Sequence, residues 1–284
     1  MIQDRSRAAV FLIGLALSAC VVPARKPLVD PFPLRFPLTE VGALEIEGRV
    51  VGQPWTRDGV VYLATSDGVL TAVVVPSRSV LWRRSGGGGL GEAESLAGPG
   101  DLAEPVLRVE GKSLRAFDKE GGKIWEFEAG EAIPADPSQL GDRVYFGTDG
   151  RLFYCLDAAT GKVRWRRRLQ GAPLHPAVVI GGTVVVAASN SVVYFLSARG
   201  GSILSWETVS SRVVYPPASA GPLVLVSSAS RELTALEFKT RKRVGQYLAP
   251  GPLAAGAVWS PPYVVLFVED AESGRHRLVF LRSR

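Results

Sequence analysis

The sequence predicts an all-β protein, a β-propeller made of four-stranded blades. The first observation is a repeat: tryptophans follow one another at intervals of 43, 40 and 41 residues, and a tyrosine follows after another 41. These residues are Trp82, Trp125, Trp165, Trp206 and Tyr247. The second observation is that each repeat consists of short runs rich in Val, Leu, Tyr and Phe between turn residues, as strands do. The third is that no stretch has the apolar spacing of an amphipathic helix. A repeat of about 40 residues matches one propeller blade.

Residues 1–19 are predicted to be a secretory signal peptide. Two arginines, Arg5 and Arg7, precede the apolar run of residues 8–17. A helix that spans a bilayer needs roughly 20 apolar residues. The run is therefore too short for a membrane anchor and fits the apolar region of a signal peptide.

Cys20 is predicted to carry a lipid. It follows Ser18 and Ala19, and this ending resembles the lipobox of bacterial lipoproteins. The resemblance implies that cleavage leaves Cys20 as the N-terminus, with a diacylglycerol on its thiol. Because Val21 and not Asp follows the cysteine, the same resemblance favours the periplasmic face of the outer membrane. Residues 20–37 contain five prolines and are expected to form an extended tether.

The propeller is expected over residues 38–284. A strand at 39–47 comes first, then the repeats that end at the five aromatic residues, then three strands near residues 254–259, 263–269 and 277–281. The 247 residues of this span make about six blades, and seven is the alternative count. The strand at 39–47 is expected to complete the last blade, which closes the ring and removes an exposed edge. Residues 83–105, rich in Gly, Pro and Glu, are expected to form an irregular insertion.

Turn chemistry within the repeats supports these strands. Asp67-Gly68 and Asp149-Gly150 each lie between two apolar runs, where a two-residue hairpin needs positive φ. In the Asp-Ala-Ala-Thr-Gly sequence of residues 157–161, the Asp157 carboxylate is expected to accept backbone N–H bonds while Gly161 takes the left-handed conformation.

The tryptophans at the repeat ends are assigned to folding. An indole buries a large apolar area, and its N–H can reach a backbone carbonyl. Each repeating tryptophan is therefore expected to be a plug between adjacent blades: Trp82, Trp125, Trp165 and Trp206.

Composition and charge narrow the function. With 46% hydrophobic and 21% charged residues, the chain is expected to be globular and not disordered. The net charge of +6 is a modest, dispersed excess, and together with the export signal it argues against nucleic acid as a partner. After lipidation of Cys20, Cys155 has no intramolecular partner, and its apolar neighbours predict a buried, inert thiol.

The phrase Cys-Leu-Asp-Ala-Ala-Thr-Gly-Lys-Val-Arg-Trp at residues 155–165 resembles the repeat of the pyrroloquinoline-quinone-type propellers. The resemblance extends over residues 50–250 and implies a β-propeller fold. One branch of that group contains quinoprotein dehydrogenases, which carry the quinone and a calcium ion. Another contains the BamB lipoproteins, non-catalytic scaffolds of the outer-membrane β-barrel assembly machinery.

The sequence departs from the dehydrogenase branch. Those enzymes use an adjacent cysteine pair and a set of acidic and amide ligands, whereas Cys155 has no neighbouring cysteine and Asn190 is the single asparagine. Calcium prefers about six to eight oxygen ligands, and acidic residues are dense only at 92–104. No cofactor and no metal are therefore expected.

No catalytic residue is expected either. His175 and His276 are the only histidines, and neither has a nucleophile or ligand motif around it. The basic runs at 83–84, 164–168 and 241–243 have two interpretations. They form a contact surface for an acidic partner or anionic lipid, or they are solvated strand residues that alternate outward, which the sequence favours.

The sequence thus predicts a lipid-anchored, non-catalytic propeller on the periplasmic face of the outer membrane that binds cell-envelope proteins. Its most concrete form is BamB-like assistance in outer-membrane protein assembly. One alternative is a periplasmic quinoprotein-like enzyme or small-ligand binder that uses the central channel. Another is a subunit of a lineage-specific envelope complex that shares only the fold.

Overall fold

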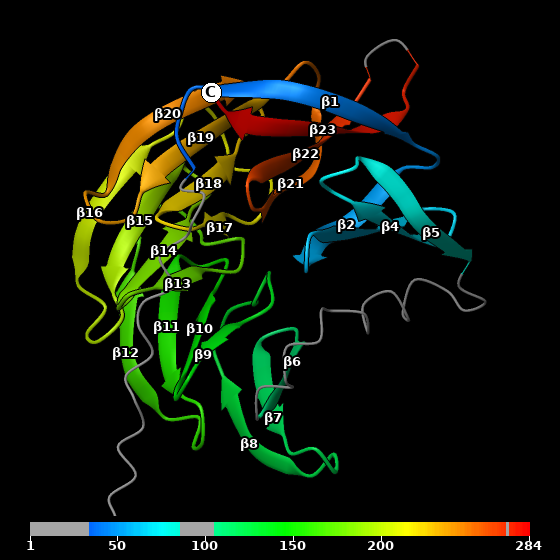
Figure 1. Ribbon diagram of the computed structural model, residues 1–284. Coiled ribbons are helices and arrows are strands. Elements are labelled where there is room, and N and C mark those ends of the chain that lie inside the picture. The colour runs from blue at the N-terminus through cyan, green and yellow to red at the C-terminus, as the bar shows by residue number, and fades with distance from the viewer. Residues whose placement is uncertain (1–33, 86–104, 271–272) are drawn as a thin grey trace, which may run out of the picture. The chain divides into compact units, whose positions relative to one another are not determined.

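The structure is a computed structural model that describes residues 34–85, 105–270 and 273–284. Its regular elements are all β-strands, which form six antiparallel sheets, as predicted for a propeller of six blades (Figure 1). Within the described residues, no helix is long and apolar enough to span a membrane.

Each sheet is one blade, numbered here in chain order. Blade 1 contains β2 (Val50–Arg57), β3 (Val60–Thr65), β4 (Val69–Val74) and β5 (Ser79–Ser85). Blade 2 has three strands among the described residues, β6 (Val106–Glu110), β7 (Ser113–Phe117) and β8 (Lys123–Glu128). Blade 3 contains β9 (Ser138–Leu140), β10 (Arg143–Gly147), β11 (Leu152–Asp157) and β12 (Val163–Arg168).

The remaining blades follow the same order. Blade 4 contains β13 (Val178–Ile180), β14 (Thr183–Ala187), β15 (Val192–Ser197) and β16 (Ile203–Thr208). Blade 5 contains β17 (Ala218–Ala220), β18 (Leu223–Ser227), β19 (Glu232–Glu237) and β20 (Lys242–Leu248). Blade 6 contains β21 (Leu253–Ser260), β22 (Tyr263–Glu269), β23 (His276–Ser283) and β1 (Leu38–Ile46).

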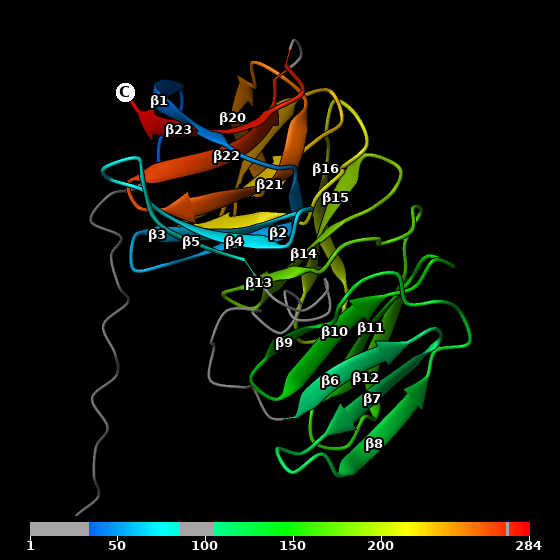
Figure 2. The ribbon, with the colours of Figure 1, turned by 90° about the vertical axis from the view of Figure 1, so that its right-hand side faces the viewer.

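The two ends of the propeller sequence meet in blade 6. Strand β1 pairs antiparallel with β23, from Leu38 opposite Ser283 to Ile46 opposite His276 (Figures 1 and 2). The N-terminal strand therefore completes the last sheet, as the sequence predicted. This pairing leaves β23 without an open edge, because β22 covers its other side.

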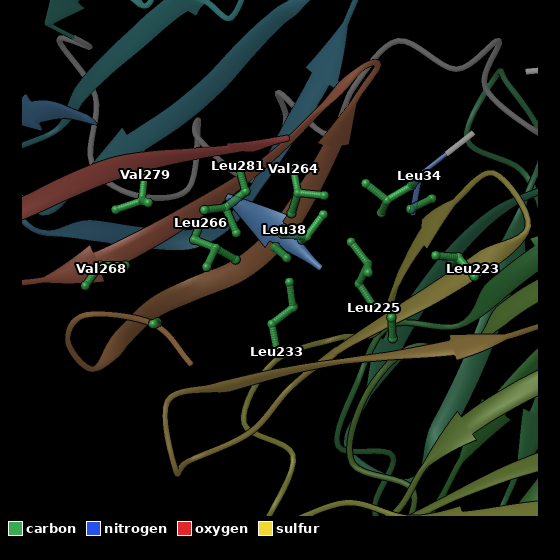
Figure 3. Close-up of a cluster of buried hydrophobic side chains, with 14 residues drawn as sticks. Leu34, Leu38, Leu223, Leu225, Leu233, Val264, Leu266, Val268, Val279 and Leu281 are labelled. Atoms are coloured by element: carbon green, nitrogen blue, oxygen red, sulfur yellow. The ribbon is translucent and has the colours of Figure 1, made fainter. Parts of the chain in front are cut away.

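The apolar core lies between the sheets. Five clusters of buried residues each join two successive blades, and they link blades 2, 3, 4, 5, 6 and 1 in that order. Between blades 5 and 6, for example, Leu225 and Leu233 pack with Leu266 and Leu281 (Figure 3). A strand in the middle of a blade is consequently buried on both faces, as in β14, where all five residues are buried.

The last residues of the predicted tether, 34–37, pack against the propeller. Leu34 is 4% exposed and packs in the cluster between blades 5 and 6, with Phe36 against it. The Arg35 N–H donates to Ser283 Oγ at 2.8 Å. Residues 34–37 are therefore anchored, and the predicted tether boundary at residue 37 was wrong. The predicted signal peptide and Cys20 lie outside the described residues.

Two other expectations need correction. Strand β5 continues to Ser85, so the insertion does not begin at residue 83, and its remainder up to residue 104 lies outside the described residues. In the hairpin at Asp149-Gly150 the residue with positive φ is Arg151, at 71°. A Cβ on Gly150 would lie 1.9 Å from the carboxyl group at the end of the Glu131 side chain, which would have to move to make room. Gly68 does take positive φ, as expected.

The anchoring of the N-terminal segment predicts a stability effect. Replacing Leu34 with Ala should lower the free energy of unfolding by about 2–5 kcal/mol, because a buried Leu leaves a cavity. Leu248 is 63% exposed, so Leu248→Ala should change the free energy of unfolding by less than about 0.5 kcal/mol. Urea titration of both variants measures the difference, and equal stabilities would show that residue 34 is part of the tether after all.

Candidate interaction surface

Trp125 and Trp165 are buried plugs between successive blades. Each is 8% exposed. The Trp125 indole N–H of blade 2 donates to the Ala158 carbonyl of blade 3 at 2.8 Å, and that of Trp165 donates to Ala198 of blade 4 at 3.0 Å. The same contact thus recurs one blade further on, which is the geometric basis of the repeat.

Each plug packs against a glycine in the turn of the next blade. A Cβ on Gly161 would lie 2.7 Å from the Trp125 ring, and one on Gly201 would lie 2.4 Å from the Trp165 ring. Both glycines also have positive φ, at 68° and 67°. Close approach of the ring and the left-handed backbone therefore both require glycine here.

Asp157 fixes the turn that holds Gly161. Its Oδ1 accepts hydrogen bonds from the N–H groups of Ala159 and Thr160 at 3.1 and 3.0 Å, and its Oδ2 lies 2.6 Å from the Arg164 guanidinium. The Arg164 hydrogen bond, with that of the Thr160 hydroxyl, lowers the pKa of Asp157 to about 2. The Asp157 carboxylate therefore accepts backbone N–H bonds in this turn, as the sequence predicts.

Trp82 makes different contacts from these two plugs. It is half-buried, its ring centroid lies 6.1 Å from that of Tyr62 in its own sheet, and Arg84 lies 5.0 Å above it. In the described part of the chain, nothing lies within 4 Å of a Cβ on Gly121 in the corresponding turn of blade 2. Trp82 therefore does not pack against this glycine as Trp125 and Trp165 pack against Gly161 and Gly201.

Trp206 is not a plug, and the prediction was wrong for this residue: its side chain is 63% exposed. In blade 3 the plug Trp165 lies opposite Cys155, but in blade 4 the corresponding pair is Ser205 opposite Phe195. Trp206 is one residue further along β16, opposite Tyr194. A shift of one residue in a strand places the side chain on the other face.

Other aromatic residues replace the missing plugs. In blade 4 the ring has moved to the neighbouring strand, where Phe195 is fully buried against blade 5. In blade 5 both members of the pair are small, Ala235 and Gly245, and a Cβ on Gly245 would lie 2.2 Å from Phe36. Phe36 of the N-terminal segment therefore fills the space between blades 5 and 6. Sequence analysis missed both replacements, because neither lies at the repeating position.

Most of the basic runs have structural partners. Arg164 forms ion pairs with Asp142 and Asp157, and Arg83 lies 2.8 Å from Glu47. Arg167 donates to the Gly201 carbonyl at 2.7 Å, and Arg243 donates to the Thr208 carbonyl at 2.6 Å. These last two bonds use the arginine hydrogens but leave the positive charges unneutralised. Arg166 and Arg168 are exposed on β12.

The buried titratable groups are used inside the fold. Cys155 is a free, fully buried thiol whose pKa is raised by burial. His175 Nε2 lies 3.2 Å from the Val213 carbonyl. His276 Nδ1 accepts a hydrogen bond from the Val50 N–H at 2.7 Å, so it ties blade 6 to the first strand of blade 1.

The described residues do not fit a quinone and calcium site. Among them, no group of three or more His, Cys, Asp and Glu side chains could hold a metal ion. Cys155, the only cysteine they include, is packed in the joint between blades 3 and 4. No chemical step through such a cofactor follows from this structure.

Exposed apolar side chains gather on the outermost strands of the blades. Among the residues that the structure describes, ten large hydrophobic residues are exposed, and nine of them lie on these strands: Val41, Leu81, Ile124, Val163, Ile203, Leu204, Trp206, Val244 and Leu248. Strand β16 alone carries three of them, Ile203, Leu204 and Trp206. The rim formed by the outer strands is therefore the candidate interaction surface, and β16 is its most apolar part.

Repeated antiparallel blades with tryptophan plugs and Asp-x-x-x-Gly turns define a β-propeller of the quinoprotein-type repeat. The family model described as "Outer membrane protein assembly factor BamB" matches residues 110–207 and 175–279, which is more than half of the chain. The chain belongs to that family.

Individual relatives carry the same description. The chain is 26% identical over 188 residues to the outer membrane protein assembly factor BamB of Yersinia pestis, a match that covers 60% of this chain and 48% of the relative. To the BamB of Legionella pneumophila (strain Paris) it is 23% identical over 191 residues, covering 63% and 49%. The chain thus spans about half the length of these relatives.

A solved propeller shows the same fold. The β-propeller domain of Cps50 (Swd1) from Myceliophteria thermophila covers 87% of this chain and is covered completely, with a TM-score of 0.59 and 12% identity. At this identity the likeness concerns the fold alone.

The difference between the two tryptophan positions predicts opposite mutational effects. Trp165→Ala should lower the free energy of unfolding by about 3–5 kcal/mol, because it leaves a cavity between blades 3 and 4. Trp206→Ala should change it by less than about 0.5 kcal/mol, because the side chain is exposed. Thermal or chemical unfolding of the two variants decides this, and a large loss in Trp206→Ala would contradict the register described here.

The histidines predict a pH dependence. Burial lowers the pKa of His276, with Arg49 acting in the same direction and Glu269 against it. Burial also lowers the pKa of His175. The unfolded chain therefore binds more protons below a pH of about 6.5, and the free energy of unfolding should fall as the pH decreases from about 7 to 5. The slope should be smaller in His276→Gln, and an unchanged slope in both His276→Gln and His175→Gln would contradict this account.

Proposed function

We propose that this protein is a non-catalytic, lipid-anchored scaffold on the periplasmic face of the outer membrane. It binds subunits of the β-barrel assembly machinery and so assists outer-membrane protein assembly. The observation that carries the proposal is membership of the assembly-factor family over more than half of the chain. Both relatives described above are also named as outer membrane protein assembly factors.

The use of the side chains supports a scaffold. Groups that often carry catalysis are committed to the fold: Cys155 lies in a joint between blades, and His175 and His276 each contact a backbone group of another blade. The outer strands, by contrast, expose large apolar side chains together with Trp206 and several arginines, and tryptophan and arginine are enriched at protein interfaces.

The sequence before the propeller supports the anchor. The lipobox-like ending at Cys20 is followed by Val21, and Leu34 is the first residue packed into the core. A chain of 14 residues spans at most about 50 Å. A lipid on Cys20 would therefore keep the propeller close to the membrane surface, within reach of other envelope proteins.

Affinity capture tests the proposal. The tagged full-length lipoprotein is isolated from gently solubilised membranes of its own cells, and co-purifying proteins are identified by mass spectrometry. We expect β-barrel assembly subunits in stoichiometric amounts, and we expect Cys20→Ser to move the protein from the membrane to the soluble fraction. Capture of an unrelated envelope complex without those subunits would contradict the assembly role.

A further inference from the structure

The outer strand of blade 4 differs from the other outer strands at one position. Residues that correspond to Trp206 in the strand pairing are Arg83, Glu126, Arg166 and Gln246 in blades 1, 2, 3 and 5. All four are polar, as expected for a solvated rim. Blade 4 instead exposes 63% of a tryptophan there, and that ring fills no joint between blades.

Two more apolar side chains extend the same surface. Ile203 and Leu204, which precede Trp206 on β16, are each 40% exposed. Trp206 lies opposite Tyr194, whose ring is buried, so the strand beneath the exposed indole is firmly packed. An exposed tryptophan on a rigid support is typical of the residues that dominate binding energy in protein interfaces.

Positive charge frames this strand at both ends. Arg167 of β12 contacts Gly201, just before β16, and Arg243 of β20 contacts Thr208, its last residue. Both arginines bond to neutral carbonyls and keep their charge. Further basic residues lie on the two flanking blades: Arg166, Arg168, Arg241 and Lys242. Glu207 is the only carboxylate of β16 and is half-buried.

We infer that Ile203, Leu204 and Trp206 form a docking surface for an acidic protein segment with apolar side chains. The apolar side chains of that segment would cover the indole, and its Asp and Glu residues would face the flanking arginines. This inference rests on the proposed scaffold function and specifies the place and the kind of partner.

A peptide experiment tests the chemistry of the surface. The probe is a short fluorescent peptide in which Leu and Glu alternate, and the comparison peptide has Lys in place of Glu. Fluorescence anisotropy with the full chain should show binding of the acidic peptide, weakened by salt, and no binding of the basic one. Equal binding of both peptides, or of neither, would overturn the inference.

Matched variants test the location. Trp206→Gln introduces the residue that blade 5 has at the corresponding position, Gln246. Leu204→Gln changes the residue at the β-bulge of β16, and Leu81 is the corresponding bulge residue of blade 1. Both should weaken peptide binding at least about tenfold, whereas the control Leu81→Gln should not. All three positions are exposed, so the unfolding temperature should stay the same. Equal losses in Leu81→Gln and Leu204→Gln would overturn the location.

The same variants separate this inference from the proposed function. If assembly subunits are captured equally by the natural chain and by Trp206→Gln, the docking surface is wrong while the assembly role stands. If the acidic peptide binds at Trp206 but no assembly subunit is captured, the surface stands and the assembly role is wrong.

Discussion

The packing of each sheet against the next is the interaction on which the rest of this structure depends. Blades 3 to 6 each have buried apolar residues on both faces and pack between two neighbours, so each depends on the blades beside it. Trp125 lies between blades 2 and 3 and Trp165 between blades 3 and 4, and in each case the residue of the next blade's turn against which the ring packs must be glycine. Loss of one ring at the repeating position is therefore accompanied by another ring from elsewhere, Phe195 in one joint and Phe36 in the next.

Much of this architecture could be predicted from the sequence. The period of the aromatic residues, the Asp157–Gly161 turn and the count of strands near the C-terminus were sufficient for six blades and for the pairing of β1 with β23. These features depend on local sequence patterns, which repeat because each blade solves the same packing problem.

The details that could not be predicted depend on one residue of register or on contacts between distant segments. Trp206 lies within one residue of the position that the repeat spacing predicts. A difference of one residue along a strand is enough to place its side chain on the surface instead of in the core. Leu34 and Phe36 lie in a proline-rich stretch that has the composition of a linker. Only the folded structure shows that Leu34 is buried between blades 5 and 6 and that Phe36 packs against Gly245. The repeat spacing predicts a buried plug at Trp206, so the exposed tryptophan on β16 could not be predicted from it.

The proposed role of this member of the assembly-factor family is protein binding, and β16 is where the described surface departs most from a solvated rim. Amide hydrogen exchange of the full-length lipoprotein, alone and bound to the β-barrel assembly complex, tests this most directly. We expect slower exchange across Ile203–Thr208 in the complex and unchanged exchange across Ser79–Ser85. Protection elsewhere on the propeller, with Ile203–Thr208 unchanged, would contradict it.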